Sequence, residues 1–259
     1  MMKIFLGVLQ WLYYWICYPF IIKDKRLKVL HNSHVGEDCF IIGLGPSLNI
    51  NDLDTLNKAD AFCFSMNNVD KVFSKTKWRP NVYFVSDPII AKQSEFEEKV
   101  IRLDKDGVIT LCPKNVFPQV PSCMIRYVKN FSRNKFYKIA NGCIVKGVTK
   151  FSKNAYHQIY DGSSCVHSII QLAYYMGFNT IYLLGVDCGS SSTLDYSPLI
   201  GEKSKGVYAS LTVSQRLIMD FESLNKSLQM SKTPLKIINA TRGGFLEVFP
   251  REKIDNIIK

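Results

Sequence analysis

Short apolar runs alternate with amphipathic segments along most of the chain, and glycine or polar residues follow almost every apolar run. Uninterrupted apolar runs of about four to five residues predict buried strands. We expect such strands at 39–42, 61–65, 82–85, 108–111, 181–184 and 235–238. Helical spacing predicts helices at 51–57, 69–74, 89–100, 165–176 and 210–230. This alternation indicates an α/β protein with a mostly parallel sheet flanked by helices.

The first apolar run leads directly into a Gly-x-Gly-Pro-Ser turn. Gly43 and Gly45 lack a Cβ, so a bulky ligand can approach the main chain there. Pro46 suits the first turn of a helix, and Ser47 can cap the helix that follows. Free N–H groups at such a turn are a natural seat for phosphate, although an ordinary strand-to-helix turn uses the same residues. Leu48 replaces the third glycine of the dinucleotide fingerprint, which argues against a plain NAD site.

Polar side chains also follow the other predicted strands and precede one helix. They are Asn67, Asn68, Ser86, Asp87, Asp187, Asn239 and Thr241, with Ser163 and Ser164 at the helix start. Each of them is also common as a turn or cap residue. Because the carboxyl ends of parallel strands form one edge of a sheet, we expect these residues to surround one ligand site. Asp87 and Asp187 could bind hydroxyls, hold a metal or act as a base.

Composition and charge narrow the class of partner. The chain is 47% hydrophobic and carries a net charge of +11, from 33 Lys and Arg against 22 Asp and Glu. This excess fits a phosphorylated substrate or an anionic membrane surface. No basic run interleaved with aromatics is present, so we expect no nucleic acid partner. The eight cysteines lack any Cys-x-x-Cys spacing, which predicts reduced thiols in the cytoplasm and no metal site.

Residues 4–22 carry no charge and are rich in aromatic side chains, and a basic cluster at 23–28 follows them. We expect an apolar N-terminal helix that lies on the cytoplasmic face of the inner membrane, with the cluster against anionic lipid. A bilayer-spanning helix and a helix packed on the protein's own core are the alternatives. The chain then divides into a membrane-associated segment at 1–30 and one domain at 36–259. Three prolines between 112 and 160 predict an insertion or lid over the open end of the sheet.

Several motifs together resemble a known family. They are Phe40–Leu48 (FIIGLGPSL), Met66–Asn68 (MNN), Asp161–Ser164 (DGSS), Met176–Asp187 (MGFNTIYLLGVD) and Asn239–Pro250 (NATRGGFLEVFP). This pattern is similar to that of the 6-hydroxymethylpterin diphosphokinase-like family over about residues 36–252. It also resembles the small bacterial sialyltransferases that use CMP-activated sugars, and the motility-associated glycosyltransferases of flagellin. The resemblance implies a Rossmann-like nucleotide-binding domain.

The resemblance favours a glycosyltransferase of bacterial surface polysaccharide synthesis that moves a sialic- or nonulosonic-acid-type sugar. The donor is then a nucleotide-sugar, with a CMP-sugar expected first, and the acceptor a glycan or a lipid-linked glycan. The resemblance places Gly43, Gly45, Pro46 and Ser47 along the donor's phosphate and sugar, Asn67 on the donor, and Ser163 and Ser164 on the nucleotide. Tyr196 falls near the spacing of the sialyltransferases' phosphate-binding tyrosine. Those enzymes also have a downstream histidine base, whereas no histidine follows His167 here, so Asp187 or Asp87 is the candidate base.

Two alternatives remain open from the sequence. A diphosphotransferase of the 6-hydroxymethylpterin diphosphokinase type would transfer diphosphate from ATP, with Mg²⁺ held by Asp87 and Asp187. A soluble cofactor enzyme of that kind has little use for the apolar segment at 4–22. A catalytically inactive, membrane-tethered scaffold is the second alternative, which the absent histidine permits. Nucleotide binding separates the scaffold from either enzyme.

Overall fold

The computed structural model describes residues 23–114, 117, 119–130, 138–140, 143–145, 150–189, 196–201 and 211–258. The expected apolar helix at 4–22 lies outside these ranges. Within them, none of the helices combines the length and the hydropathy that a bilayer-spanning segment requires.

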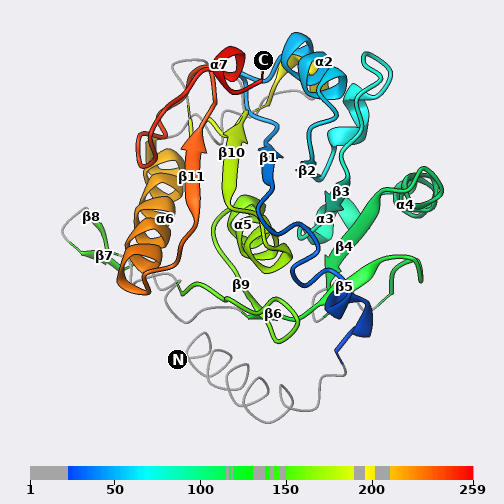
Figure 1. Ribbon diagram of the computed structural model, residues 1–259, viewed down its shortest axis with the longest axis horizontal. Helices are drawn as coiled ribbons and strands as arrows, with labels where there is room; N and C mark the ends of the chain where they lie inside the picture. Colours follow the sequence, from blue (N-terminus) through cyan, green and yellow to red (C-terminus); the bar gives the residue numbers. More distant parts are fainter. Residues whose placement is uncertain are drawn as a thin grey trace.

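A seven-stranded sheet forms the centre of the molecule, and every neighbouring pair of its strands is parallel (Figure 1). From one edge to the other the strands are β11 (Lys236–Asn239), β10 (Thr180–Leu184), β1 (Asp38–Ile42), β2 (Cys63–Met66), β3 (Val82–Phe84), β4 (Ile109–Pro113) and β5 (Ile125–Tyr127). The chain moves outward from β1 to β5 and then returns to place β10 on the other side of β1. The strand order therefore reverses between β1 and β10, which is where open α/β sheets bind their ligands.

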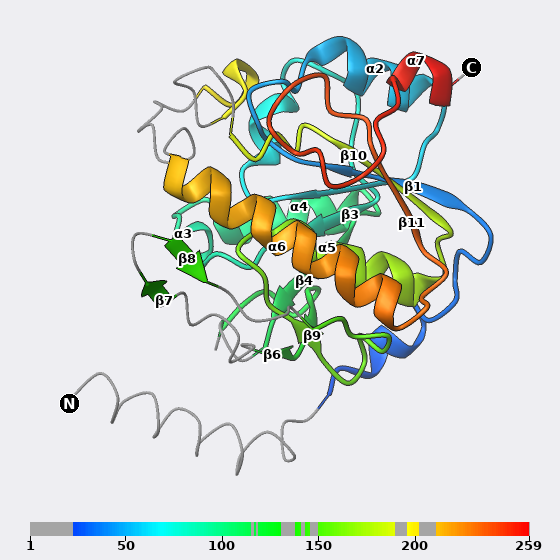
Figure 2. The ribbon, with the colours of Figure 1, turned by 90° about the vertical axis from the view of Figure 1, so that its left-hand side faces the viewer.

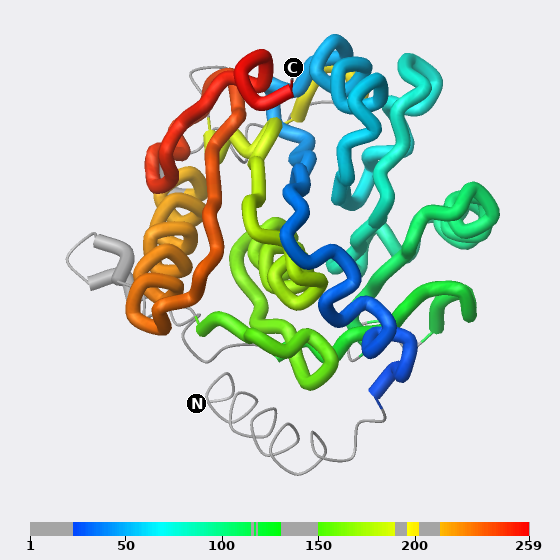
Figure 3. The backbone as a smooth tube through the Cα atoms, in the orientation of Figure 1, coloured from blue at the N-terminus to red at the C-terminus, as the bar shows by residue number. Residues whose placement is uncertain are grey.

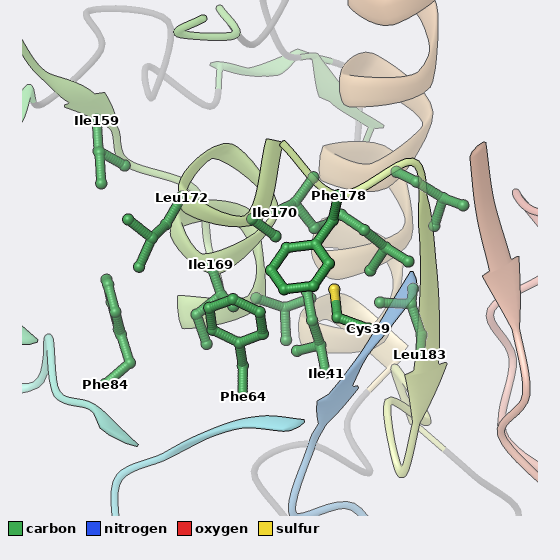
Figure 4. Packing of buried hydrophobic residues seen from close by; sticks show 14 of the residues in the cluster. Cys39, Ile41, Phe64, Phe84, Ile159, Ile169, Ile170, Leu172, Phe178 and Leu183 are labelled. Atoms are coloured by element: carbon green, nitrogen blue, oxygen red, sulfur yellow. The ribbon is translucent and has the colours of Figure 1, made fainter. Parts of the chain in front are cut away.

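Helices cover both faces of the sheet. α5 (Cys165–Met176) and α6 (Leu211–Met230) lie on one side, and α2 (Ile50–Lys58) and α7 (Ile254–Ile257) lie on the other (Figure 2). Side chains alternate along β1, so Cys39 and Ile41 enter the core under α5 while Phe40 and Ile42 enter the opposite core. Figure 4 shows the first of these cores, where Ile169 of α5 packs with Ile41 and Phe64 of the sheet. The α/β, Rossmann-like architecture expected from the sequence is confirmed.

The remaining elements are short. They are η2 (Lys25–Lys28), η3 (Val69–Val72), α3 (Pro88–Ala91), α4 (Phe96–Lys105), β6 (Lys129–Asn130), β7 (Lys138–Ala140), β8 (Cys143–Val145), β9 (Ile159–Tyr160) and η5 (Pro198–Ile200). The single helix expected at 89–100 is wrong, because α3 ends at Ala91 and α4 begins only at Phe96. The acidic first turn of α4, with Glu97 and Glu98, marks that second start.

The segment at 112–160 is only in part an addition to the domain. Its β5 completes the edge of the central sheet, with Ile125 opposite Leu111 of β4. The chain then passes below α5 through β6 and β9, as the path in Figure 3 shows, and these two strands pair in parallel. The expectation of a simple insertion or lid is therefore wrong for β5, which belongs to the core sheet.

The domain also begins earlier in the chain than residue 36. Leu27 is 1% exposed and belongs to the core under α5. The Arg26 guanidinium donates hydrogen bonds to the carbonyl oxygens of Ser122 at 2.9 Å and Met124 at 2.7 Å, and it also pairs with Asp24. Residues 24–30 are thus packed onto the sheet, and the boundary expected between 30 and 36 moves toward the N-terminus.

Candidate functional site

A cavity of about 380 Å³ lies at the carboxyl ends of β1, β2, β3 and β10, beside the first turn of α5. Its volume falls in the range of small-molecule sites. Most of the residues expected from the sequence line it: Gly43, Gly45, Pro46, Asn67, Asp87, Ser163, Ser164, Asp187 and Tyr196. The cavity therefore occupies the point where the strand order reverses, as the rim of polar residues predicted.

The turn after β1 is joined to the turn after β10. The amide of Gly43 donates a 2.7 Å hydrogen bond to the carbonyl of Leu184, and the amide of Gly45 donates one of 2.9 Å to that of Gly185. A Cβ at Gly43 would overlap the Gly185 oxygen. The glycines thus allow two backbones to approach closely, and their amides are not free donors for a phosphate. This corrects the expectation of free N–H groups at Gly43 and Gly45, although both residues line the cavity.

Asp187 closes the same junction with its side chain. Oδ2 accepts hydrogen bonds from the Ser47 hydroxyl at 2.9 Å and from the Ser47 amide at 3.4 Å. The residue is 4% exposed, and this burial raises the pKa of its carboxyl, while the hydrogen bonds from Ser47 partly offset the rise. Ser47 does not cap α2 as expected, because the Asn49 side chain accepts from the Asp52 amide and holds that position.

Asn67 reaches the cavity from the end of β2 in a left-handed backbone conformation, with φ at 53°. The Tyr83 hydroxyl donates to its carbonyl oxygen at 2.6 Å, which fixes this turn. Its side-chain nitrogen lies 3.8 Å from Sγ of Cys165, and the Ser86 hydroxyl lies 2.9 Å from the same sulfur. Asn68 is buried at the start of η3 and is not among the lining residues.

Two further walls come from α3 and α5. Asp87 caps α3, its Oδ1 accepting from the Ile89 amide at 2.9 Å, and it remains half-buried at the cavity. Ser164 caps α5, its hydroxyl oxygen accepting from the Val166 amide at 3.3 Å. The amide of Ser163 donates to Asp220 of α6 at 2.7 Å. Tyr196 lines the cavity near η5.

Asn239 and Thr241 lie outside the cavity. Asn239 is 1% exposed, and its side chain donates to the Leu246 carbonyl at 2.6 Å and accepts from the Thr241 amide at 3.0 Å. The Thr241 hydroxyl accepts from the Val186 amide at 3.1 Å. Both side chains therefore hold backbone groups in place: Asn239 fixes the loop at 240–246, and Thr241 fixes the end of β10 and the turn after it.

The cavity wall also carries an ion pair that is not expected from the sequence. Nζ of Lys129 lies 3.1 Å from Oδ1 of Asp161, and both residues line the cavity. Asp161 belongs to the DGSS motif, which offered a signal for it. Lys129 offered none, because only the pairing of β6 with β9 brings it there.

The described residues contain no preformed metal-binding cluster. No three His, Cys, Asp or Glu side chains among them converge closely enough to hold an ion. Asp187 and Asp87 instead accept hydrogen bonds from Ser47 and from the α3 amide.

A parallel sheet that reverses its strand order beside a cavity defines the Rossmann-like class of α/β proteins. The chain belongs to the family of 6-hydroxymethylpterin diphosphokinase MptE-like proteins, whose model matches residues 17–193. Among solved structures it is similar to the MAf glycosyltransferase from Magnetospirillum magneticum AMB-1, with a TM-score of 0.52 and 16% identity. The similarity covers 86% of this chain and 34% of the other, so this chain spans about a third of that protein and the likeness is one of fold. No curated protein matches the chain in sequence.

Proposed function

We propose that the protein is a glycosyltransferase of bacterial surface polysaccharide synthesis. It transfers a sialic- or nonulosonic-acid-type sugar from a CMP-activated donor to a glycan or lipid-linked acceptor. The observation that carries this proposal is the cavity itself, which gathers Asn67, Ser163, Ser164 and Asp187 at the switch point of the sheet. The fold shared with the MAf glycosyltransferase supports it.

Three side chains supply the chemistry in this proposal. A base must take the proton of the acceptor hydroxyl, and a carboxylate whose pKa is raised by burial suits that task, so Asp187 is our first candidate. Asp87, a half-buried lining residue at the end of β3, is the second. The Tyr196 hydroxyl would donate to the phosphate of the leaving nucleotide.

The family description supports a second candidate, an ATP-dependent diphosphotransferase of the 6-hydroxymethylpterin diphosphokinase type. That reaction requires Mg²⁺ on carboxylates and substrate phosphates, for which Asp87 and Asp187 would serve. Their hydrogen bonds to protein donors make this the weaker proposal.

The first proposal also includes a location. A lipid-linked acceptor lies at the inner membrane, and we propose that residues 4–22 attach the protein peripherally to that membrane.

A nucleotide panel tests these functions. CMP, CDP, UDP and ATP are each added to the full chain. A nucleotide present at a hundred times its dissociation constant adds about 2.7 kcal/mol to the free energy of unfolding, which thermal unfolding detects. Release of CMP from CMP-N-acetylneuraminic acid, with and without EDTA, then measures turnover. CMP binding with EDTA-insensitive release supports the glycosyltransferase. ATP binding with EDTA-sensitive diphosphate transfer supports the alternative, and binding of no nucleotide leaves the non-catalytic scaffold.

A further inference from the structure

Lys129 is the only Lys or Arg among the described residues that line the cavity. Its positive charge is held by Asp161, with Nζ 3.1 Å from Oδ1, and the two side chains are 8% and 9% exposed. The other charged groups on the described walls are the carboxylates of Asp87 and Asp187. Among the described lining residues, a phosphate that entered the cavity would therefore meet one cationic side chain.

The backbone places the Lys129–Asp161 pair close to the start of α5. β6 and β9 pair in parallel, with Lys129 opposite Ile159, and the Asp161 amide donates to the Asn130 carbonyl at 2.9 Å. Two residues after Asp161 the chain reaches Ser163 and Ser164 and enters the twelve-residue helix α5. The N-terminal end of a helix carries partial positive charge, so Lys129 and α5 present the same sign of potential to the cavity.

The field of Lys129 extends to this helix start. Burial raises the pKa of the Cys165 thiol, and the hydrogen bond with Ser86 and the positive charge of Lys129 partly offset that rise. Asp161 acts on the same thiol in the opposite direction. The cation and its carboxylate partner therefore both act on the region where Ser164 and Cys165 meet the cavity.

Stability alone is a poor reason for this ion pair. A buried pair loses the hydration of both ions, and well-packed apolar residues often stabilise a protein as much or more. The pair is also on a cavity wall, where an entering anion can replace the carboxylate as the partner of the ammonium. Because the Gly43 and Gly45 amides already donate to the carbonyls of Leu184 and Gly185, a phosphate would need another donor.

We propose that Lys129 is the phosphate-binding side chain of the cavity, and that Asp161 holds it in place and competes with the phosphate for it. This inference rests on the proposed use of a nucleotide donor, which it extends to the residue that recognises the nucleotide's charge. When the phosphate enters, the ammonium transfers its ion pair from Asp161 to a phosphate oxygen. A Lys–phosphate contact of this kind is charge-assisted and strong.

The test compares CMP with cytidine, which has the same base and ribose and lacks the phosphate. Calorimetric affinities are measured for the full chain and for Lys129→Gln, Lys129→Arg and Asp161→Asn. In Lys129→Gln we expect CMP affinity to fall roughly 10- to 100-fold, the loss of one charged hydrogen bond, with cytidine affinity unchanged. Lys129→Arg should retain most of the CMP affinity. Asp161→Asn keeps an oxygen acceptor for the ammonium but removes the competing charge, so CMP should bind several-fold tighter.

The opposite signs of the two neutralising variants separate this inference from a structural ion pair. A structural pair would make both Lys129→Gln and Asp161→Asn weaken CMP and cytidine alike, and that result overturns the proposal. If Lys129→Gln does not fold, the double variant Lys129→Met with Asp161→Leu, which leaves no buried charge unpaired, replaces it with the same expected loss of CMP affinity.

Inorganic pyrophosphate distinguishes failure of this inference from failure of the proposed function. Wild-type protein that binds CMP but loses none of that affinity in Lys129→Gln refutes the inference and leaves the function standing. Binding of pyrophosphate that depends on Lys129, without binding of any nucleotide in the panel, refutes the function and supports the anion site. Binding of neither probe refutes both.

Discussion

The Ser47 hydroxyl donates a 2.9 Å hydrogen bond to Oδ2 of Asp187, a residue 140 positions further along the chain. This contact joins the turn after β1 to the turn after β10 at the edge of the cavity. It means that Asp187 has two possible roles, to hold the junction together and to act on a substrate, and the two roles predict different outcomes on substitution.

We expect Asp187→Asn to lower the turnover of the donor by roughly a hundredfold or more, because it removes an acid–base group. Asn retains a side-chain oxygen that can accept from Ser47, so the melting temperature should change little. Steady-state rates and thermal unfolding of the same preparation provide the measurement. A large loss of stability with normal turnover in the folded fraction would assign Asp187 to the junction alone.

The pH dependence of stability gives a second, independent reading of Asp187. Burial raises its pKa above the ordinary value of 3.8, so the folded protein holds this proton more tightly than the unfolded chain. The associated stability is therefore present at low pH and is lost as the pH rises from 3.8 through the raised pKa. In urea unfolding between pH 4 and pH 7, the free energy of unfolding of the wild type should fall relative to that of Asp187→Asn as the pH rises. A constant difference would contradict the raised pKa.

Gly45→Ala is expected to destabilise the fold, because its Cβ would overlap Oδ2 of Asp187 and lie 2.7 Å from the Gly185 oxygen. Overpacking of this kind costs about 1–3 kcal/mol. Gly243→Ala is the matched control, since a Cβ there meets nothing within 4 Å. Denaturant unfolding of both variants checks the prediction. Equal stability of the two would show that the β1 and β10 turns have room to separate.

A chain that starts at Lys23 should fold, whereas one that starts at Gly36 should lose stability. The second truncation removes Leu27 from the core and removes the Arg26 hydrogen bonds to residues 122–124. The point variant Leu27→Ala should reproduce about 2–5 kcal/mol of that loss. Equal stability of both truncations would place residues 24–30 outside the folding unit.

Vesicle flotation of the full chain and of the chain from Lys23 tests separately whether residues 4–22 bind membrane.

Two asparagines at strand ends should behave differently. Asn239→Ala leaves the buried Leu246 carbonyl and Thr241 amide without these partners and should cost about 1–3 kcal/mol for each. Asn67→Gly keeps the left-handed backbone at a residue that lines the cavity, so it should change nucleotide affinity more than stability. Calorimetric titration with CMP and urea unfolding distinguish the two effects. A reversed ranking would exchange their roles.

The strands and their polar ends could be predicted because each depends on a local pattern. Ile41 and Leu183 belong to apolar runs typical of buried strands, and Asn67 and Asp187 stand in the turns that follow β2 and β10. Asn239 occupies an equivalent position but turns into the closing loop, a choice made by contacts with residues 246 and 250. A pattern of polar positions locates the edge of the sheet and does not decide which side chains face the ligand.

Lys129 and β5 could not be predicted because their environment depends on distant pairing. β5 has three residues, one of them Arg126, and no periodicity distinguishes it from the proline-rich loop around it. Lys129 becomes a cavity residue only because β6 pairs with β9, about thirty positions later, with Lys129 opposite Ile159. The division of the expected helix into two is local instead, since α3 ends at Ala91 and α4 begins with its own acidic first turn at Phe96.

The hydrogen bonds between the turns after β1 and β10 have a mechanical consequence. Separation of these turns would break the bonds from Gly43 and Gly45 together with the Ser47–Asp187 contact, so this side of the cavity moves as one stiff body. The amide hydrogens of Gly43 and Gly45 should accordingly exchange with solvent late and together. Adjustment to ligands of different size then falls to lining residues outside this junction, such as Asn67 and Ser163.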